Sequence, residues 1–211
     1  MVLQQHHNNW NEIFELKGFF AEPFMMFGFQ EMTSKQYPQI GQTNFKEYLS
    51  TKGVIDCTII DWNDTRADIH FDMNMPWPTQ WDRRYKVFAD IGCLEHVLNT
   101  YQCLKNSLSL VDINGLYLLH TPVSGYFKHG LHTFNPEMIR WILRENGFFI
   151  VYDKLSTKSG APIKENEIIG GDDVLLWIVA RKVREVEEFI IPIDNHGSFF
   201  HRKEQPKEMV V

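Results

Sequence analysis

Acidic and aromatic residues stand directly after two short apolar runs of the sequence. Asp61 and Trp62 follow the first run, and Asp72 and Met73 follow the second. If both runs are strands of an open α/β sheet, these residues lie at its carboxyl edge, where such sheets bind ligands. A carboxylate there can accept hydrogen bonds from both ribose hydroxyls, an indole can cover a purine, and a second carboxylate can accept from the adenine amine. The alternative is that both aspartates are solvated turn residues, because aspartate is common in turns.

Three histidines close together in the sequence offer a second kind of chemistry. His120, His129 and His132 surround the end of a later apolar run. An imidazole can act as a general base that takes a proton from a hydroxyl or an amine, and His129 and His132 are the candidates. Their spacing matches no standard zinc pattern, so we expect no metal. The competing interpretation is three loop histidines with ordinary hydrogen bonds.

The elements that must position these side chains follow an α/β pattern, because short apolar runs alternate with helix-like stretches. Helices are expected between most of the strands, with start signals at Asn44 and at Asn135-Pro136-Glu137. Because parallel strands need right-handed crossovers, we expect a Rossmann-like, doubly wound, seven-stranded and mostly parallel sheet. The last two strands lack a clear helix between them, so one strand is expected to be antiparallel. The seven strands are predicted at residues 23–27, 54–60, 67–71, 85–91, 115–120, 148–152 and 174–180.

The length of 211 residues is that of one domain with short extensions. We expect an N-terminal helical extension over residues 1–20, the main domain over residues 21–183 and a C-terminal tail over residues 184–211. Amphipathic spacing predicts one helix over about residues 9–20 of the first segment.

Composition excludes several classes of protein. Hydrophobic residues make up 44% and charged residues 23%, which excludes a disordered chain. The formal net charge of -6 argues against a mainly electrostatic nucleic-acid binder. The three cysteines form no CxxC pair, which favours a reducing compartment. We see neither a signal-peptide pattern nor an apolar run near the roughly 20 residues of a membrane span. A cytoplasmic protein without membrane contact is expected, and self-association into a homo-oligomer stays open.

Several segments form an ordered series of motifs. The segment 71–78 has an aspartate followed shortly by proline, and the segment 85–97 joins an apolar strand to Leu94-Glu95-His96-Val97. These segments resemble the class I S-adenosylmethionine-dependent methyltransferases. The run 114–122 is similar to the fifth strand of that family, and the segment 132–148 is similar to the helix and the Gly-Phe pair that follow. The resemblance covers about residues 23 to 182, and the ordered series is more specific than any single motif.

The resemblance implies roles for residues that follow the first four strands. The first loop would lie beside the methionine moiety of S-adenosylmethionine, Asp61 would hold the ribose, and Trp62 would lie against adenine. The second aspartate and the methionine after it would contact the adenine amine and ring, and the end of the fourth strand would line the pocket near the sulfonium. The implied cofactor-binding residues are Gly28, Phe29, Gln30, Asp61, Trp62, Asp72, Met73, Asp90, Ile91 and Gly92.

The first loop departs from the family pattern. That loop usually carries two or three alternating glycines, whereas this chain has Gly28 followed by the bulky Phe29 and Gln30. The expected activity is methyl transfer from S-adenosylmethionine to a small-molecule or glycan-type acceptor. One alternative is a catalytically silent methyltransferase-like binding or scaffold protein. Another is an α/β domain that binds a nucleotide sugar or a dinucleotide.

Overall fold

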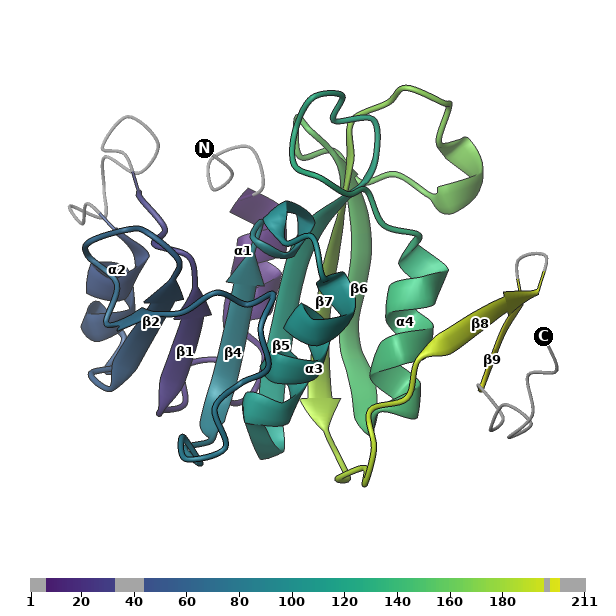
Figure 1. Ribbon diagram of the computed structural model, residues 1–211. Coiled ribbons are helices and arrows are strands. Elements are labelled where there is room, and N and C mark those ends of the chain that lie inside the picture. The colour runs from purple at the N-terminus through teal and green to yellow at the C-terminus, as the bar shows by residue number, and fades with distance from the viewer. Residues whose placement is uncertain (1–6, 33–43, 196–197, 202–211) are drawn as a thin grey trace, which may run out of the picture.

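A computed structural model describes residues 7–32, 44–195 and 198–201. Figure 1 shows one twisted sheet with helices on both faces and a small hairpin beside it. The helices are α1 (His7–Phe14), α2 (Phe45–Thr51), α3 (Thr100–Leu110) and α4 (Pro136–Glu145), with single 3-10 turns η1 (Leu94–His96) and η2 (Glu165–Glu167). The strands are β1 (Phe24–Phe27), β2 (Cys57–Asp61), β3 (Ile69–His70), β4 (Tyr85–Ile91), β5 (Val111–Ser124), β6 (Phe148–Thr157), β7 (Val174–Lys182), β8 (Pro192–Asn195) and β9 (Ser198–His201).

The seven-stranded sheet has the order β3-β2-β1-β4-β5-β7-β6. β1 to β5 pair in parallel, and β7 runs antiparallel to both β5 and β6. The predicted fold class is therefore confirmed, including its one antiparallel strand. The expectation of helices between most strands fails for β2 to β3 and for β3 to β4, which no α-helix joins in the described chain. The lack of an α-helix between β6 and β7 agrees with the prediction.

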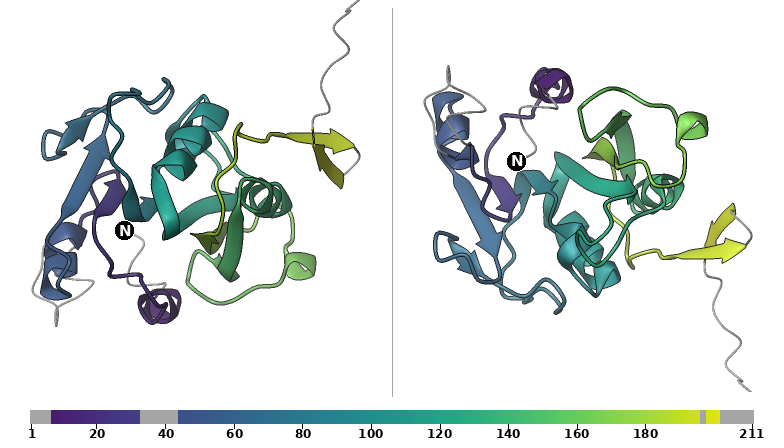
Figure 2. Two further views of the ribbon diagram at one scale, coloured as in Figure 1. Left: turned by 90° about the horizontal axis from the view of Figure 1, so that it is seen from below. Right: turned by 90° about the horizontal axis from the view of Figure 1, so that it is seen from above.

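The sheet separates two hydrophobic cores, because side chains alternate between its faces along each strand. In β1, Phe24 and Met26 join the core beneath α1 and α2, whereas Met25 and Phe27 join the core beneath α3 and α4. Figure 2 shows α1 and α3 on opposite sides of the sheet. β1 is thus buried on both faces, as its unalternating apolar sequence predicts.

Some boundaries differ from the sequence prediction. The helix expected over residues 9–20 ends at Phe14, although Phe19 is also buried in the same core. The strand expected at residues 67–71 contains only Ile69 and His70. β5 does not end at Thr121-Pro122, because Pro122 pairs with Leu175 and the ladder continues to Ser124.

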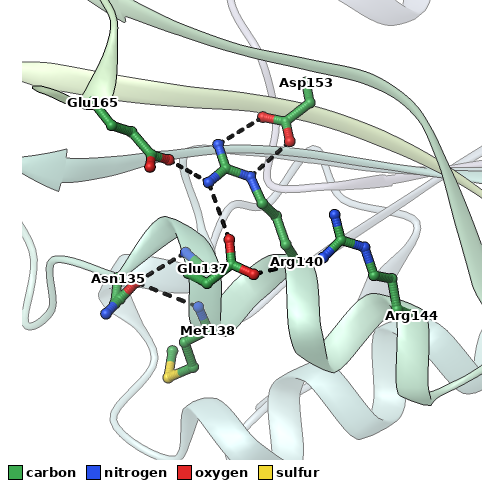
Figure 3. A network of polar contacts seen from close by, with 7 residues as sticks. All are labelled: Asn135, Glu137, Met138, Arg140, Arg144, Asp153 and Glu165. Atoms are coloured by element: carbon green, nitrogen blue, oxygen red, sulfur yellow. Dashed lines mark hydrogen bonds and ion pairs between the residues drawn. The ribbon is translucent and has the colours of Figure 1, made fainter. Parts of the chain in front are cut away.

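Polar contacts fix α4 against the sheet (Figure 3). The Asn135 side chain accepts hydrogen bonds from the backbone N–H of Glu137 and Met138 at 2.8 and 3.3 Å, so it is the predicted N-cap. Arg140 donates to Asp153 of β6 at 2.7 and 3.0 Å and also pairs with Glu165 of η2. These contacts join the helix to β6 and to the loop that precedes β7.

The segment after β7 was expected to be a tail. Asn146 and Ile190 exchange hydrogen bonds at 2.8 Å, which ties this segment to the end of α4. The hairpin of β8 and β9, which the sequence did not predict, projects away from the sheet (Figures 1 and 2). Parts of the predicted extension and tail, residues 1–6 and 202–211, lie outside the described residues, and the division at 20/21 and 183/184 stays a prediction.

The cap on α4 can be tested by Asn135→Ala, which leaves the N–H groups of Glu137 and Met138 without their acceptor. We expect the free energy of unfolding to fall by about 1 kcal/mol in urea titrations. Asn135→Ser keeps a capping oxygen and is the matched control, so it should stay near wild type. Equal losses in the two variants would contradict the capping role.

Candidate cofactor site

A cleft of about 520 Å³ opens at the carboxyl ends of β1 and β2, beside the turn after β4. Parallel strands present their carboxyl ends at one edge of a sheet, which is why residues from distant parts of the chain meet there. The residues that line the cleft are Phe27, Asp61, Trp62, Asn63, Phe71, Asp72, Met73, Asn74, Cys93, His96 and Val97.

Asp61 and Trp62 form one wall of this cleft. Asp61 Oδ1 accepts hydrogen bonds from the backbone N–H of Asn63 and Asp64 at 3.0 and 3.2 Å, which holds the carboxylate at the end of β2. Its Oδ2 accepts a longer bond of 3.4 Å from the N–H of Phe29. The Trp62 side chain is 66% exposed, so its indole face is available to a planar ligand.

Asp72 and Met73 line another part of the cleft. Asp72 Oδ1 accepts from the backbone N–H and the side-chain amide of Asn74 at 2.9 and 2.7 Å, forming a tight turn. Met73 is buried beneath this turn. The structure thus brings the two predicted pairs to one cleft, whereas their contact with a cofactor stays a prediction.

The loop after β1 lies next to the cleft but does not line it. Gly28 has φ +77°, and a Cβ atom there would lie 2.4 Å from Cys93 Sγ. The Phe29 ring packs on the core beneath α1 and α2 and carries the Arg66 guanidinium 3.8 Å from its centre. The Gln30 side chain turns the other way and donates to the Ile91 carbonyl at 3.0 Å. Gln30, and not Phe29, therefore links the loop after β1 to the end of β4.

The end of β4 is also beneath the cleft surface. Asp90 is fully buried, and its Oδ1 accepts from the N–H groups of Cys93 and Leu94 at 3.0 and 3.2 Å. Burial, and next the charge of Glu95, raises the pKa of the Asp90 carboxyl well above its ordinary value. Ile91 is the last residue of the strand and Gly92 follows it, and neither lines the cleft. That the predicted residues of the β1 loop and the β4 end bind cofactor stays a prediction.

Several lining residues were not assigned to the cleft from the sequence. Phe71 and Asn74 flank the Asp72 pair, and Cys93, His96 and Val97 follow β4 within the motif that carries the family resemblance. Cys93 Sγ donates to the Phe27 carbonyl at 3.0 Å. Burial raises the pKa of this thiol well above its ordinary value, so Cys93 is a structural thiol and not an activated nucleophile.

The three predicted histidines lie in different surroundings. His120 is buried in β5 with its ring 4.0 Å from that of Trp177. The half-exposed His129 faces the buried Glu95, with Nε2 3.7 Å from Oε1. His132 Nε2 is buried without a hydrogen-bond partner among the described residues. His129 is therefore the histidine that both solvent and a carboxylate can reach.

From the sequence, Glu95 was assigned no role beyond its place in the motif Leu94-Glu95-His96-Val97, and the structure places its side chain in the interior. Its side chain is 2% exposed, and its Oε2 accepts from Thr121 Oγ1 at 3.1 Å. Burial raises the pKa of the Glu95 carboxyl.

Gly28→Ala tests the close approach of the β1 loop to Cys93. The new Cβ meets Sγ at 2.4 Å and the residue keeps a left-handed φ of +77°, so we expect a loss of about 1–3 kcal/mol in the free energy of unfolding. Gly53→Ala is the control, because Gly53 has φ +89° with no atom within 4 Å of its Cβ position. In a Cys93→Ala background, Gly28→Ala should cost no more than Gly53→Ala; an undiminished loss there would contradict the steric argument.

This chain is similar to known proteins in its three-dimensional structure and not in its sequence. No family model and no curated protein matches the sequence. A SAM-dependent methyltransferase from Archaeoglobus fulgidus matches with a TM-score of 0.52 and 14% identity, over 84% of this chain and 94% of its own. BH2331 from Bacillus halodurans, assigned as a methyltransferase, matches with a TM-score of 0.50 and 12% identity, over 84% and 98%.

TehB from Haemophilus influenzae matches with a TM-score of 0.50 and 13% identity, over 84% of this chain. The chain spans 62% of the length of TehB. In the described part of the chain, every helix is too short or too polar to cross a membrane. The strand order and these matches agree: the chain has the fold of the class I S-adenosylmethionine-dependent methyltransferases, as the resemblance of its motifs predicted.

Proposed function

We propose that the protein binds S-adenosylmethionine in the cleft and transfers its methyl group to a small-molecule or glycan-type acceptor. The observation that carries the proposal is the convergence of Asp61, Trp62, Asp72 and Met73 on one cleft of about 520 Å³ in a methyltransferase fold. The dinucleotide alternative is less well supported, because that fold has the order 3-2-1-4-5-6 and this sheet inserts antiparallel β7 between β5 and β6.

The residues present fit the nucleoside part of the cofactor. The Asp61 carboxylate at the end of β2 accepts hydrogen bonds from the two ribose hydroxyls, and the exposed Trp62 ring covers the adenine. Asp72 accepts a hydrogen bond from the exocyclic amine of adenine, and Met73 makes apolar contact with the adenine ring. Each group thus supplies the chemistry that its part of adenosine requires.

The transfer itself is an in-line displacement that depends mainly on proximity and orientation. The acceptor nucleophile forms a bond to the methyl carbon while the carbon–sulfur bond breaks, and the electron pair remains on sulfur to give S-adenosylhomocysteine. A hydroxyl or ammonium acceptor also loses a proton. His129, oriented toward Glu95 at 3.7 Å, is the first candidate for the group that activates the acceptor, and His132 is the second.

The acceptor and the compartment are further parts of the proposal. A net charge of -6 disfavours a nucleic-acid acceptor, in keeping with the proposed small-molecule or glycan-type acceptor. Cys57, Cys93 and Cys103 are free thiols, which supports a reducing compartment such as the cytoplasm.

A silent methyltransferase-like binding protein is the second candidate, and the β1 loop favours it. Gln30 Nε2 bonds to the Ile91 carbonyl at 3.0 Å, and Cys93 Sγ lies against Gly28. Both contacts narrow the region that the methionine end of the cofactor would enter.

Asp61→Ala tests the nucleoside site by calorimetric titration with S-adenosylhomocysteine. Loss of charge-assisted hydrogen bonds should weaken binding by about 1–3 kcal/mol. Asp61→Asn keeps an oxygen for the N–H groups of Asn63 and Asp64, so it separates loss of charge from collapse of the turn. Asp82→Ala, an exposed acid outside the cleft lining, is the matched control. Affinity unchanged in Asp61→Ala would remove Asp61 from the site.

Gln30→Ala distinguishes the two candidate functions. The wild-type protein must give up the Gln30–Ile91 hydrogen bond to admit the methionine end, at a cost of about 1 kcal/mol. We expect Gln30→Ala to bind S-adenosylhomocysteine about fivefold more tightly while the affinity for adenosine stays unchanged. If wild type and variant bind adenosine but neither binds S-adenosylhomocysteine, the silent protein is supported and methyl transfer is rejected.

A further inference from the structure

A cluster of three side chains beside the cleft has the composition of a metal site. Among the residues that the structure describes, Glu95, His96 and His129 offer one donor atom each, and these atoms lie within 4.8 Å of one another. The two imidazole rings are 5.0 Å apart and nearly perpendicular, at 78°. Glu95 and His96 come from η1, whereas His129 comes from the loop after β5.

The carboxylate of this cluster is held in one orientation. Glu95 is 2% exposed, and Thr121 Oγ1 donates to its Oε2 at 3.1 Å, which leaves Oε1 facing His129 Nε2 at 3.7 Å. Metal ligands commonly have such an outer hydrogen bond, which fixes the direction of the ligating atom. A buried carboxylate is also costly unless positive charge or hydrogen bonds compensate it, and a cation between these groups would supply that charge.

The loop that carries His129 is held over Glu95 by its backbone. The Glu95 carbonyl accepts from the N–H of Leu131 at 2.7 Å and of His132 at 3.2 Å. A Cβ atom at Gly130 would lie 3.0 Å from both Cγ and the carbonyl oxygen of Glu95, so the loop approaches η1 as closely as glycine allows. His129 is therefore presented to Glu95 by a fixed loop.

We propose that Glu95, His96 and His129 bind a divalent first-row transition-metal ion. Two imidazoles and one carboxylate suit zinc and its neighbours, and three protein ligands leave coordination positions open for other oxygen donors. His96 also lines the cleft, so an ion bound by these residues would lie beside the proposed cofactor site. The expectation of no metal was drawn from the spacing of His120, His129 and His132, and of these only His129 belongs to the present set.

The role of the ion rests on the proposed methyl transfer. The binding of the ion by these three residues does not depend on that function. A cation there would bind an acceptor hydroxyl and lower its pKa, and the proton released from that hydroxyl would pass to solvent. His129 would then act as a ligand and not as the proton acceptor. The proposed acceptor is then a molecule with one hydroxyl group, or two neighbouring hydroxyl groups, whose oxygen can contact both the metal ion and the methyl group.

The test is metal binding to the full chain without any cofactor. All proteins carry His6→Gln and His7→Gln, because these adjacent histidines offer an unrelated chelating pair. After treatment with EDTA and dialysis, each is titrated with Zn²⁺ by calorimetry and with Co²⁺ by visible absorption. We expect about one ion per chain and the absorption bands of Co²⁺ bound by nitrogen and oxygen.

His129→Ala and Glu95→Gln should weaken binding by about 100-fold or more, and Thr121→Val by about tenfold. His129 is half-exposed, so its replacement should leave the fold intact, which circular dichroism checks. His70→Ala, at an exposed histidine of β3 outside the cluster, is the matched control. No binding by the parent protein, or equal binding by parent and His129→Ala, would overturn the metal site.

A separate titration of the metal-free parent with S-adenosylhomocysteine keeps the two proposals distinguishable. Binding of S-adenosylhomocysteine without metal binding overturns only the metal site. Metal binding without binding of S-adenosylhomocysteine supports the metal site and overturns methyl transfer.

Discussion

One buried carboxyl group holds the turn from which the site is built. Asp90 accepts hydrogen bonds from the N–H groups of Cys93 and Leu94 at 3.0 and 3.2 Å, in the interior at the end of β4. That turn places the Cys93 thiol against Gly28 and begins η1, which carries Glu95. The turn held by Asp90 therefore contacts the β1 loop, contributes to one wall of the cleft and leads into the turn that carries Glu95.

The opposite wall is built without helices. The chain from β3 to β4 is a loop, and side-chain amides of α3 and its cap hold it in place. The side-chain amide of Asn99, the cap of α3, donates to the Asn74 carbonyl at 3.3 Å. Asn106 accepts from the N–H of Trp77 at 3.0 Å and donates to the carbonyl of Met75 at 2.8 Å. These bonds satisfy backbone groups that a crossover helix would otherwise satisfy internally. This wall of the cleft thus consists of turns that side-chain amides hold in place.

Local sequence was sufficient for much of the fold. The unalternating run at β1, the capping residues Asn44 and Asn135 and the strand at residues 85–91 all appear where the sequence predicts them. These features depend on neighbours within a few residues, so a sequence pattern reports them directly. The meeting of Asp61, Trp62, Asp72 and Met73 at one cleft was also predictable, because parallel strands bring their carboxyl ends to one edge whatever fills the rest of the sheet.

By itself, then, the sequence determined the sheet, its one antiparallel strand and the meeting of Asp61 with Asp72 at one cleft. Only the tertiary structure decided where neighbouring side chains point. Phe29 turns to one core while Gln30 reaches β4, and Glu95 meets a histidine 34 positions away, since His129 belongs to another loop. These outcomes depend on contacts between segments far apart in the chain, and spacing along a sequence carries no information about the direction in which a folded loop returns.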